Sequence, residues 1–341
     1  MKISIVGWYG MKNVGDEAFR FVLPQFFEGH EIEFVTPPNH PNNPDIVILG
    51  GGAVAAPFYL SVLPDCPRYA LGIDIAYESE IDLLAEANFK GVFVRNSSDI
   101  TTMQKKLSCP VEAIPDLAFL LKPSGKDVLG KYKKTNQKTL GILVTDYVNP
   151  AIDRPVEEFA QRAFDFKLKM AAELDVLTSE GYEIVMIPCA TSGYGDDRRI
   201  NLDIGAFMKR QPTQIFDTLD PQQMIDLIAQ LDGTICQRFH AHIFSMIAGV
   251  PFISLEFTRK VKLLLNENNL QHTTGASFHG ETFDASRLRE TLGVVLAENA
   301  QLLTDGWRRT TIAISLGSSN KFDESGSQRR LEAFDVTIPS D

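Results

Sequence analysis

Residues 233–260 read GTICQRFHAHIFSMIAGVPFISLEFTRK, and this stretch contains a complete βαβ unit. Its apolar pattern predicts a strand over 233–236, a helix over 241–248 and a second strand over 252–255. Strands that are joined through a crossover helix run parallel to each other. We therefore expect an α/β fold with a parallel sheet.

The same alternation of short apolar runs and longer amphipathic segments extends through the rest of the chain. Further strands are predicted at 3–6, 32–35, 46–49, 69–73, 92–95, 111–114, 140–145 and 183–187. Further helices are predicted at 16–27, 78–89, 97–107, 156–179, 221–230, 258–268, 286–299 and 301–314. In such sheets ligands bind outside the carboxyl ends of the strands, so the residues that follow strands are the candidates for a site.

One polar segment divides the pattern into two halves. Residues 122–138 read KPSGKDVLGKYKKTNQK, which is typical of a linker or an exposed loop. We predict two Rossmann-like domains that face a cleft, over 1–122 and 139–316, joined by a linker over 123–138. The tail over 317–341 has an apolar stretch at 331–338, which suggests that it packs back on the N-terminal domain. A length of 341 residues suits two domains.

Composition excludes several classes of protein. The chain has 33 Lys and Arg against 44 Asp and Glu, a net charge of −11, which argues against a nucleic-acid-binding protein. The four cysteines are far apart and form no CxxC or Cys/His cluster, so we expect no metal site and reduced thiols in the cytoplasm. We expect residues 1–10 to form a strand rather than a signal peptide, and no segment approaches the ~20 apolar residues of a membrane span.

The first candidate loop is GWYGMKNVGDEA at 7–18, between a predicted strand and a predicted helix. Its glycines, Gly15 among them, let the backbone approach a ligand, but the spacing is not that of a dinucleotide-binding GxGxxG. Asp16 and Glu17 begin the helix, where a carboxylate either caps the helix or faces the cleft as a catalytic or acceptor-binding group. Asn13 also fits a turn.

Two more strand ends carry candidates. In DIVILGGGAV at 45–54, Gly51 and Gly52 suit a loop that a ligand approaches, or a tight strand exit packed against a neighbouring loop. In VFVRNSS at 92–98, Arg95 ends a strand, where its guanidinium can bind a carboxylate or a phosphate. The alternative is an ion pair of Arg95 with one of the nearby acidic residues, which are Asp16, Asp99 and Asp116.

The opening stretch holds the strongest candidate site. Arg238 and His240 lie at a helix N-terminus, so a guanidinium and an imidazole add to the positive end of the helix. His240 and His242 are about 200° apart around the helix axis, so only one of them can face the cleft, and we favour His240. Lys260 follows the next strand and is either a further cation of the site or a solvated surface residue. The charged run at 196–199 is typical of a solvated loop.

In order and spacing, these segments resemble the polysaccharide pyruvyl transferase family. The matching pieces are GWYGMKNVGDEA, DIVILGGG, VRNSS, IPDLAF and QRFHAHIFSMIAGVP…EFTRK, from about residue 3 to about residue 260. The resemblance implies a fold similar to GT-B glycosyltransferases. It also implies transfer of a pyruvyl group from phosphoenolpyruvate (PEP) to sugar hydroxyls. The product is a pyruvate ketal on a cell-surface polysaccharide or its lipid-linked precursor. Departures are Phe257, where the family usually has Tyr, and Asn96, where an acidic residue is common.

The resemblance also implies roles for the candidate residues. PEP would be bound by Arg95, Arg238, Phe239, His240 and Lys260. The acceptor side would include Asn13, Gly15, Glu17, Gly51 and Gly52. His240 would protonate the PEP methylene or the leaving phosphate, and Asp16 would take the proton of the attacking hydroxyl. No cofactor or metal is expected. The enzyme would work in the cytoplasm, or at the inner face of the membrane.

Two other functions fit the same residues. A GT-B-like glycosyltransferase that uses a nucleotide sugar would need the same glycine-rich loops and cations for a diphosphate. A non-catalytic protein that binds a sugar or an anion would keep the cleft without the chemistry. A pyruvyl transferase binds PEP, whereas the glycosyltransferase would not. A pyruvyl transferase also releases phosphate when it has its acceptor, whereas the non-catalytic protein would not.

Overall fold

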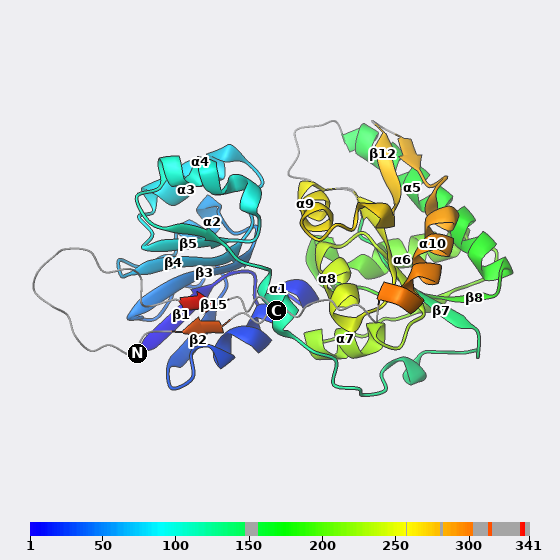
Figure 1. The fold of residues 1–341 in the computed structure, drawn as a ribbon, viewed down its shortest axis with the longest axis horizontal. Coiled ribbons are helices and arrows are strands. Elements are labelled where there is room, and N and C mark those ends of the chain that lie inside the picture. The colour runs from blue at the N-terminus through cyan, green and yellow to red at the C-terminus, as the bar shows by residue number, and fades with distance from the viewer. Residues whose placement is uncertain (147–155, 257, 280–281, 303–312, 316–334, 338–341) are drawn as a thin grey trace, which may run out of the picture.

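The computed structural model describes residues 1–146, 156–256, 258–279, 282–302, 313–315 and 335–337. It contains two open sheets, one in each half of the chain, which lie on either side of a layer of helices (Figure 1). The first sheet has six strands, all parallel, in the order β2-β1-β3-β4-β5-β6. The second has seven strands in the order β13-β12-β11-β10-β7-β8-β9. All its neighbouring strands are parallel except β13, which pairs antiparallel with β12.

The strands of the first sheet are β1 (Lys2–Val6), β2 (Glu31–Val35), β3 (Ile46–Gly52), β4 (Arg68–Ile73), β5 (Gly91–Val94) and β6 (Val111–Ala113). Those of the second are β7 (Lys138–Leu143), β8 (Tyr182–Met186), β9 (Thr213–Gln214), β10 (Gly233–Cys236), β11 (Phe252–Glu256), β12 (Thr274–His279) and β13 (Thr282–Asp284). A separate antiparallel pair joins β14 (Ala313–Ser315) to β15 (Asp335–Thr337).

The α-helices of the first half are α1 (Val14–Val22), α2 (Pro57–Leu60), α3 (Glu78–Glu86) and α4 (Ile100–Lys106). Those of the second are α5 (Val156–Ser179), α6 (Asp197–Phe207), α7 (Pro221–Ile228), α8 (Phe239–Ala248), α9 (Arg259–Glu267) and α10 (Leu288–Leu302). Short 3₁₀ turns are η1 (Leu23–Gln25), η2 (Ser97–Asp99), η3 (Leu117–Leu120), η4 (Leu129–Lys131), η5 (Gly193–Gly195) and η6 (Gln271–Thr273).

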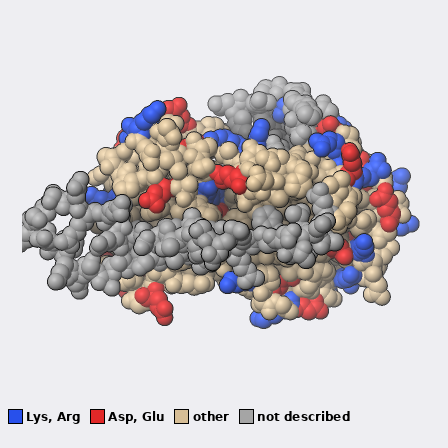
Figure 2. Space-filling view, in the orientation of Figure 1, with Lys and Arg blue, Asp and Glu red and all other residues tan. Residues whose placement is uncertain are grey.

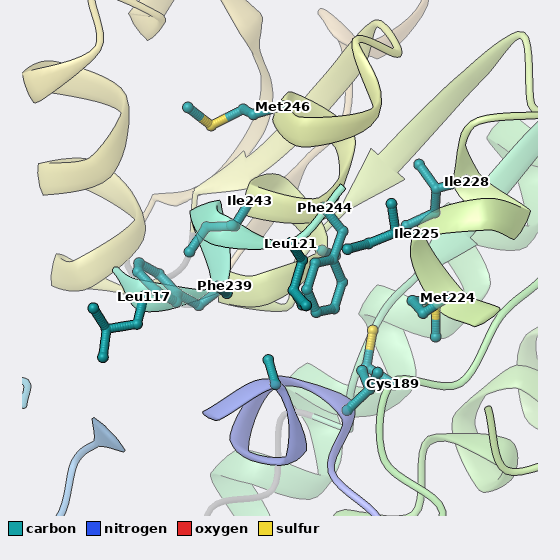
Figure 3. Close-up of a cluster of buried hydrophobic side chains, with 14 of the residues drawn as sticks. Leu117, Leu121, Cys189, Met224, Ile225, Ile228, Phe239, Ile243, Phe244 and Met246 are labelled. Atoms are coloured by element: carbon teal, nitrogen blue, oxygen red, sulfur yellow. The ribbon is translucent and has the colours of Figure 1, made fainter. Parts of the chain in front are cut away.

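Three apolar cores hold these layers together. One fills the outer face of the first sheet under α3 and α4, and one fills the outer face of the second sheet under α5, α6 and α10. The third lies between the two sheets and contains side chains of both halves. In Figure 3, Leu117 and Leu121 from the first half lie near Phe239 and Phe244 of α8. The two halves therefore share a buried hydrophobic layer.

Backbone hydrogen bonds also join the halves next to α1. The Val14 amide donates to the Cys189 carbonyl at 2.8 Å, and the Thr191 amide donates to the Lys12 carbonyl at 3.1 Å. A side-chain contact adds to these, since Nη1 of Arg259 on α9 donates to the Ile75 carbonyl at 2.8 Å. The first two contacts place α1 against the second half, and the third joins α9 to the first half.

The segment between β6 and β7 is mostly irregular. It contains η3, which packs in the shared core, and η4. The Asp226 carboxylate on α7 accepts hydrogen bonds from the amides of Ser124 and Gly125. The Glu183 carboxylate at the start of β8 accepts from the Thr135 hydroxyl. Side chains of the second half thus hold this segment along its length.

The predicted alternation is confirmed for the elements around the cleft, with differences of a few residues at most ends. The helix predicted over 16–27 ends earlier, at Val22, and a 3₁₀ turn that contains Pro24 follows it. The sequence reading missed α2, α6, β9, β12 and β13. The predicted helix over 301–314 is wrong in part, since α10 ends at Leu302 and β14 is a strand; 303–312 lie outside the described residues. Within the described residues no helix has the length and apolar character needed to cross a membrane.

Candidate functional site

A cavity of about 480 Å³ lies between the two halves, at the carboxyl ends of β1, β3, β10 and β11. Its lining comes from loops and helix starts of both halves. The lining residues are Trp8, Asn13, Asp16, Gly52, Ala53, Val54, Phe58, Tyr59, Arg95, Cys189, Arg238, Phe239, His240 and Lys260. This is the edge at which parallel sheets bind ligands.

Asn13, not Asp16, caps α1. The Asn13 side chain accepts a hydrogen bond from the Gly15 amide at 3.1 Å, which leaves the Asp16 carboxylate to line the cavity. No direct hydrogen bond or ion pair to Asp16 occurs among the residues that the structure describes. Burial raises the pKa of Asp16, and the positive charges of His240 and Lys260 oppose part of that rise. Of the two interpretations left open by the sequence, the geometry agrees with the carboxylate that faces the cleft.

The N-terminus of α8 forms the opposite wall. The helix begins at Phe239 after an extended Arg238, and no side chain among the described residues caps it. Phe239 and His240, its first two residues, both line the cavity. The first amides of a helix have no partner within it and carry the positive end of the helix dipole, so this end of α8 favours an anion.

Arg238 is held in place by a buried carboxylate. Its Nη2 lies 2.5 Å from Asp197 Oδ1 and donates to the Gly195 carbonyl at 2.9 Å. Asp197 is 1% exposed and also accepts from the amides of Cys189 and Ala190, each at 3.0 Å. Burial raises the pKa of Asp197, and the charge of Arg238 works against that rise. The interpretation of 196–199 as a solvated loop is therefore wrong for Asp197.

The two histidines of α8 have different surroundings, as their spacing predicts. His240 lines the cavity, with its Nε2 buried 3.5 Å from Asp116 Oδ2. His242 is fully buried: its Nδ1 lies 2.8 Å from the Arg238 carbonyl and its Nε2 lies 2.9 Å from Ser254 Oγ. Burial lowers the pKa of His242 to about 4, so it is a neutral core residue at pH 7.

Arg95 lies at the cavity wall, but protein carboxylates already neutralise it. Its Nη1 donates to Asp116 at 2.8 Å, its Nη2 lies 3.3 Å from Asp74, and its guanidinium stacks over the Phe239 ring at 4.6 Å. Burial would raise the pKa of Asp116, but His240 and Arg95 outweigh it and hold that pKa below its usual range. The ion-pair interpretation is therefore confirmed for Asp116, whereas Asp99 pairs with Arg259 instead.

Lys260 is a cation that no carboxylate of the described residues neutralises directly. It lines the cavity at the start of α9, with its Nζ 5.5 Å from the centre of the Phe239 ring, and it forms no ion pair with any described residue. Burial, and then the charge of Arg95, lower the pKa of Lys260. It is not a solvated surface residue, and its free charge is available to a ligand.

The remaining candidates differ in their relation to the cavity. Gly52 lines it and has a φ of +78°, next to the Asp16 carboxylate. Gly51 has a φ of +73° and packs against the Phe19 ring. Of the two interpretations of this loop, the tight strand exit packed against a neighbour therefore fits Gly51 better than the loop that a ligand approaches. Glu17 pairs with Arg20 at 2.9 Å on α1 and is absent from the cavity lining.

These residues lie in a part of the chain that is similar to known proteins. The chain matches the family model described as polysaccharide pyruvyl transferase over residues 13–257, which is most of its length. The chain belongs to this family. The match includes Asn13, Asp16, Arg95, Arg238 and His240 within its bounds. In the curated proteins, the amylovoran biosynthesis protein AmsJ of Erwinia amylovora is 22% identical over 243 residues. The match covers 63% of this chain and 57% of AmsJ, so it spans little more than half of that relative.

Solved structures agree on the fold. The chain is similar to a UDP complex of S. aureus MnaA, with a TM-score of 0.56, 10% identity and coverage of 90% and 89% of the two chains. It is also similar to Methanocaldococcus jannaschii UDP-GlcNAc 2-epimerase in complex with UDP-GlcNAc and UDP. There the TM-score is 0.57, the identity 11% and the coverage 87% and 93%. This pyruvyl transferase family member therefore has a GT-B-like fold of two Rossmann-like domains.

The sequence reading missed several residues of the site in this family member. Trp8, Phe58 and Tyr59 line the cavity, although aromatic residues in a strand–helix loop are more often part of a core. Asp74, which follows β4, pairs with Arg95 and accepts from buried Asn96 at 2.9 Å. A carboxylate directly after a predicted strand was the available signal for Asp74. Phe257, which like Asn96 departs from the family pattern, lies outside the described residues.

The positive charge of the site is local. Figure 2 shows basic and acidic side chains interspersed over the described part of the visible face. Inside the cavity, the Asp16 carboxylate lies opposite Lys260, Arg238 and the N-terminus of α8. Such a site can bind a small, multiply charged anion and place a carboxylate next to it. Among the described residues, no three His, Cys, Asp or Glu side chains gather as a metal site requires.

Proposed function

We propose that this protein transfers a pyruvyl group from PEP to two hydroxyl groups of a sugar and releases phosphate. The observation that carries the proposal is the contrast inside the cavity. A cationic wall made by Lys260, Arg238 and the start of α8 lies opposite one carboxylate, Asp16, that has no direct partner in the part of the chain that the structure describes. Family membership supports a transferase of polysaccharide biosynthesis.

PEP carries a phosphate and a carboxylate, and the cationic wall has a complement for each. The free amides at the start of α8 and the Lys260 ammonium suit the phosphate, because both favour a compact multiply charged anion. The free side of the Arg238 guanidinium suits the carboxylate, since Asp197 and Gly195 engage only Nε and Nη2. PEP is consumed as a substrate, and the proposal requires no cofactor.

The proton transfers balance between two side chains. His240 gives its proton to the PEP methylene carbon as the first sugar hydroxyl attacks C2, and Asp16 takes the proton of that hydroxyl. The second hydroxyl then attacks C2 while the bond from C2 to the phosphate oxygen breaks. His240 takes the proton of the second hydroxyl, and the proton on Asp16 leaves with the phosphate. Burial strengthens Asp16 as a base, because it raises the pKa of the carboxyl group.

Thermal unfolding with ligands tests the donor. At 100 times its dissociation constant, a ligand stabilises the folded protein by about 2.7 kcal/mol, which raises Tm by several degrees for domains of this size. We expect this shift with PEP and not with UDP-GlcNAc. We expect Lys260→Met to lose the PEP shift and Lys262→Met, an exposed lysine on the same helix, to keep it.

Arg238→Ala is a poorer variant, since it leaves the buried Asp197 carboxylate unpaired and disturbs the fold. A shift with UDP-GlcNAc and none with PEP would reject the proposal in favour of a nucleotide-sugar enzyme. A PEP shift without phosphate release, across acceptor sugars tested with the full chain, would instead indicate a non-catalytic anion-binding protein.

A further inference from the structure

The two walls of the cavity have different chemistry. The wall from the second half carries Arg238, His240 and Lys260. The wall from the first half carries three aromatic side chains, Asn13 and Asp16, and the one basic residue from that half in the lining, Arg95, is neutralised by two carboxylates. An anionic donor is therefore complementary to one wall only. The other wall suits a neutral, partly apolar ligand with hydroxyl groups.

The aromatic side chains come from two separate segments. Trp8 follows β1, and Phe58 and Tyr59 lie on the short helix α2. The Trp8 and Phe58 rings have centroids 6.3 Å apart and planes tilted by 59°, and the Phe58 and Tyr59 rings meet edge to face at 5.2 Å. Phe58 is 47% exposed although it lines the cavity, so a large part of its ring is open to a ligand.

Hydrogen-bonding groups lie beside these rings. Burial, and then the charge of Asp16, raise the pKa of Tyr59 to about 12, so its hydroxyl keeps its proton at pH 7 and can donate. Asn13 uses its Oδ1 to cap α1, which leaves its Nδ2 group to donate into the cavity. Asp16 can accept. Two donors and one acceptor match the hydroxyl groups of a sugar.

We propose that Trp8 and Phe58 form the platform on which the acceptor, a neutral pyranose, stacks, with Tyr59 and Asn13 donating to its hydroxyl groups. The C–H face of a pyranose is apolar and packs on an aromatic ring, while its edge carries hydroxyl groups that need partners. Stacked in this way, one hydroxyl edge of the sugar faces Asp16. The proposal rests on the pyruvyl transfer proposed above and names the chemistry of its acceptor.

The tilt of the two rings favours a pyranose over a nucleobase. A planar base stacks with its face on the face of an aromatic side chain. Two rings at 59° instead form an angled surface, which fits the contour of a sugar chair. Uridine therefore serves as the probe for the competing ligand class.

Saturation-transfer NMR tests the platform without knowledge of the natural acceptor. The probes are the methyl β-pyranosides of galactose, glucose and mannose, each at millimolar concentration with the full chain and saturating PEP. We expect saturation on the C–H protons of one sugar face for at least one probe. In Phe58→Ala the signal falls about three- to tenfold, which is the scale of one aromatic contact. In Phe58→Trp, which restores a ring, the signal returns.

Phe216→Ala is the matched control, because Phe216 is 53% exposed and absent from the cavity lining. The proposal is overturned if no pyranoside receives saturation, if Phe58→Ala leaves the signal unchanged, or if uridine alone gives a signal that depends on Phe58. Failure of the donor assignment has a different signature: PEP gives no thermal shift, while the pyranoside signal without PEP still depends on Phe58.

Discussion

The ring of His240 lies directly against the backbone of Gly15. A methyl group at Gly15 would be 2.0 Å from His240 Nδ1, so residue 15 must be a glycine for the imidazole to take this position. The contact crosses the boundary between the halves, since Gly15 is on α1 and His240 is on α8. The position of a candidate catalytic side chain thus depends on the absence of a side chain in the other half.

We predict that Gly15→Ala lowers turnover about 100-fold, because a displacement of about 1 Å at a reacting group has an effect of that size. The free energy of unfolding should change by only about 1 kcal/mol, since alanine favours the helix and the imidazole can rotate away. Phosphate release and denaturant unfolding measure the two effects. Gly293→Ala on α10, where a methyl group meets open space, is the control and should keep full activity. Normal turnover in Gly15→Ala would show that the position of His240 is not critical.

Lys260→Met should make the protein more stable and less active. The lysine is partly buried without a carboxylate partner among the described residues, and its lowered pKa means that its charge destabilises the folded state. A methionine of similar length removes this cost, so we expect a gain of about 1 kcal/mol.

The sign of this effect can be checked with pH. Because the folded pKa lies below the unfolded one, the cost is present at neutral pH and disappears as the pH rises toward the ordinary lysine range. The advantage of Lys260→Met over the wild type should therefore shrink as the pH rises. Equal stability of both at pH 7 would contradict a charged Lys260 that is partly removed from water, and Lys262→Met provides the baseline.

Asp197→Asn should destabilise the protein by about 3 kcal/mol, because it removes one partner of a buried ion pair. The neighbouring Asp196→Asn should cost at most about 1 kcal/mol. Asp196 pairs with partly exposed Arg198, and asparagine can still cap α6. Denaturant unfolding of the two variants compares adjacent residues of the same type. Similar losses in both would mean that the pair of Asp197 with Arg238 contributes little to stability.

Protonation of His242 should lower the free energy of unfolding in acid. Its pKa of about 4 in the folded protein lies below the ordinary value of 6.5, so the unfolded chain binds a proton first as the pH falls. Stability from this residue is complete above pH 6.5 and decreases by about 3 kcal/mol as the pH falls to 4. We expect His242→Asn to flatten the fall in unfolding free energy between pH 7 and 4.5. His40→Asn, at an exposed histidine, should leave that fall unchanged.

The fold of this protein could be predicted from local patterns. The βαβ unit at 233–260 and the alternation on either side of it follow from apolar periodicity, and strand ends then locate the candidate site. The order of His240 and His242 around α8 followed from the pitch of a helix. The start of α6 was missed because a run of two Asp and two Arg resembles a loop in composition.

Most partners of the charged residues could not be predicted, because they come from distant parts of the chain. Asp116, one of the three candidate partners of Arg95, is the exception. Arg95 pairs with Asp74 and Asp116. These three residues follow β4, β5 and β6, so their contact depends on the neighbouring positions of those strands in the sheet. Asp197 reaches Arg238 only because β8 and β10 both flank β7. Likewise, the aromatic side chains on α2 have no periodic signal in a helix of four residues.

The layer shared by the two halves has a consequence for how this enzyme family member can change. Asp16 and His240 belong to different halves, and the apolar side chains between the sheets, such as Leu121 and Phe244, set the separation between them. Substitutions in that layer would alter the distance between the proposed base and the proposed acid without contacting a substrate. Laboratory evolution toward a new acceptor should therefore accumulate substitutions in this buried layer as well as around the cavity. The effect of a substitution in one of these places should depend strongly on substitutions in the other.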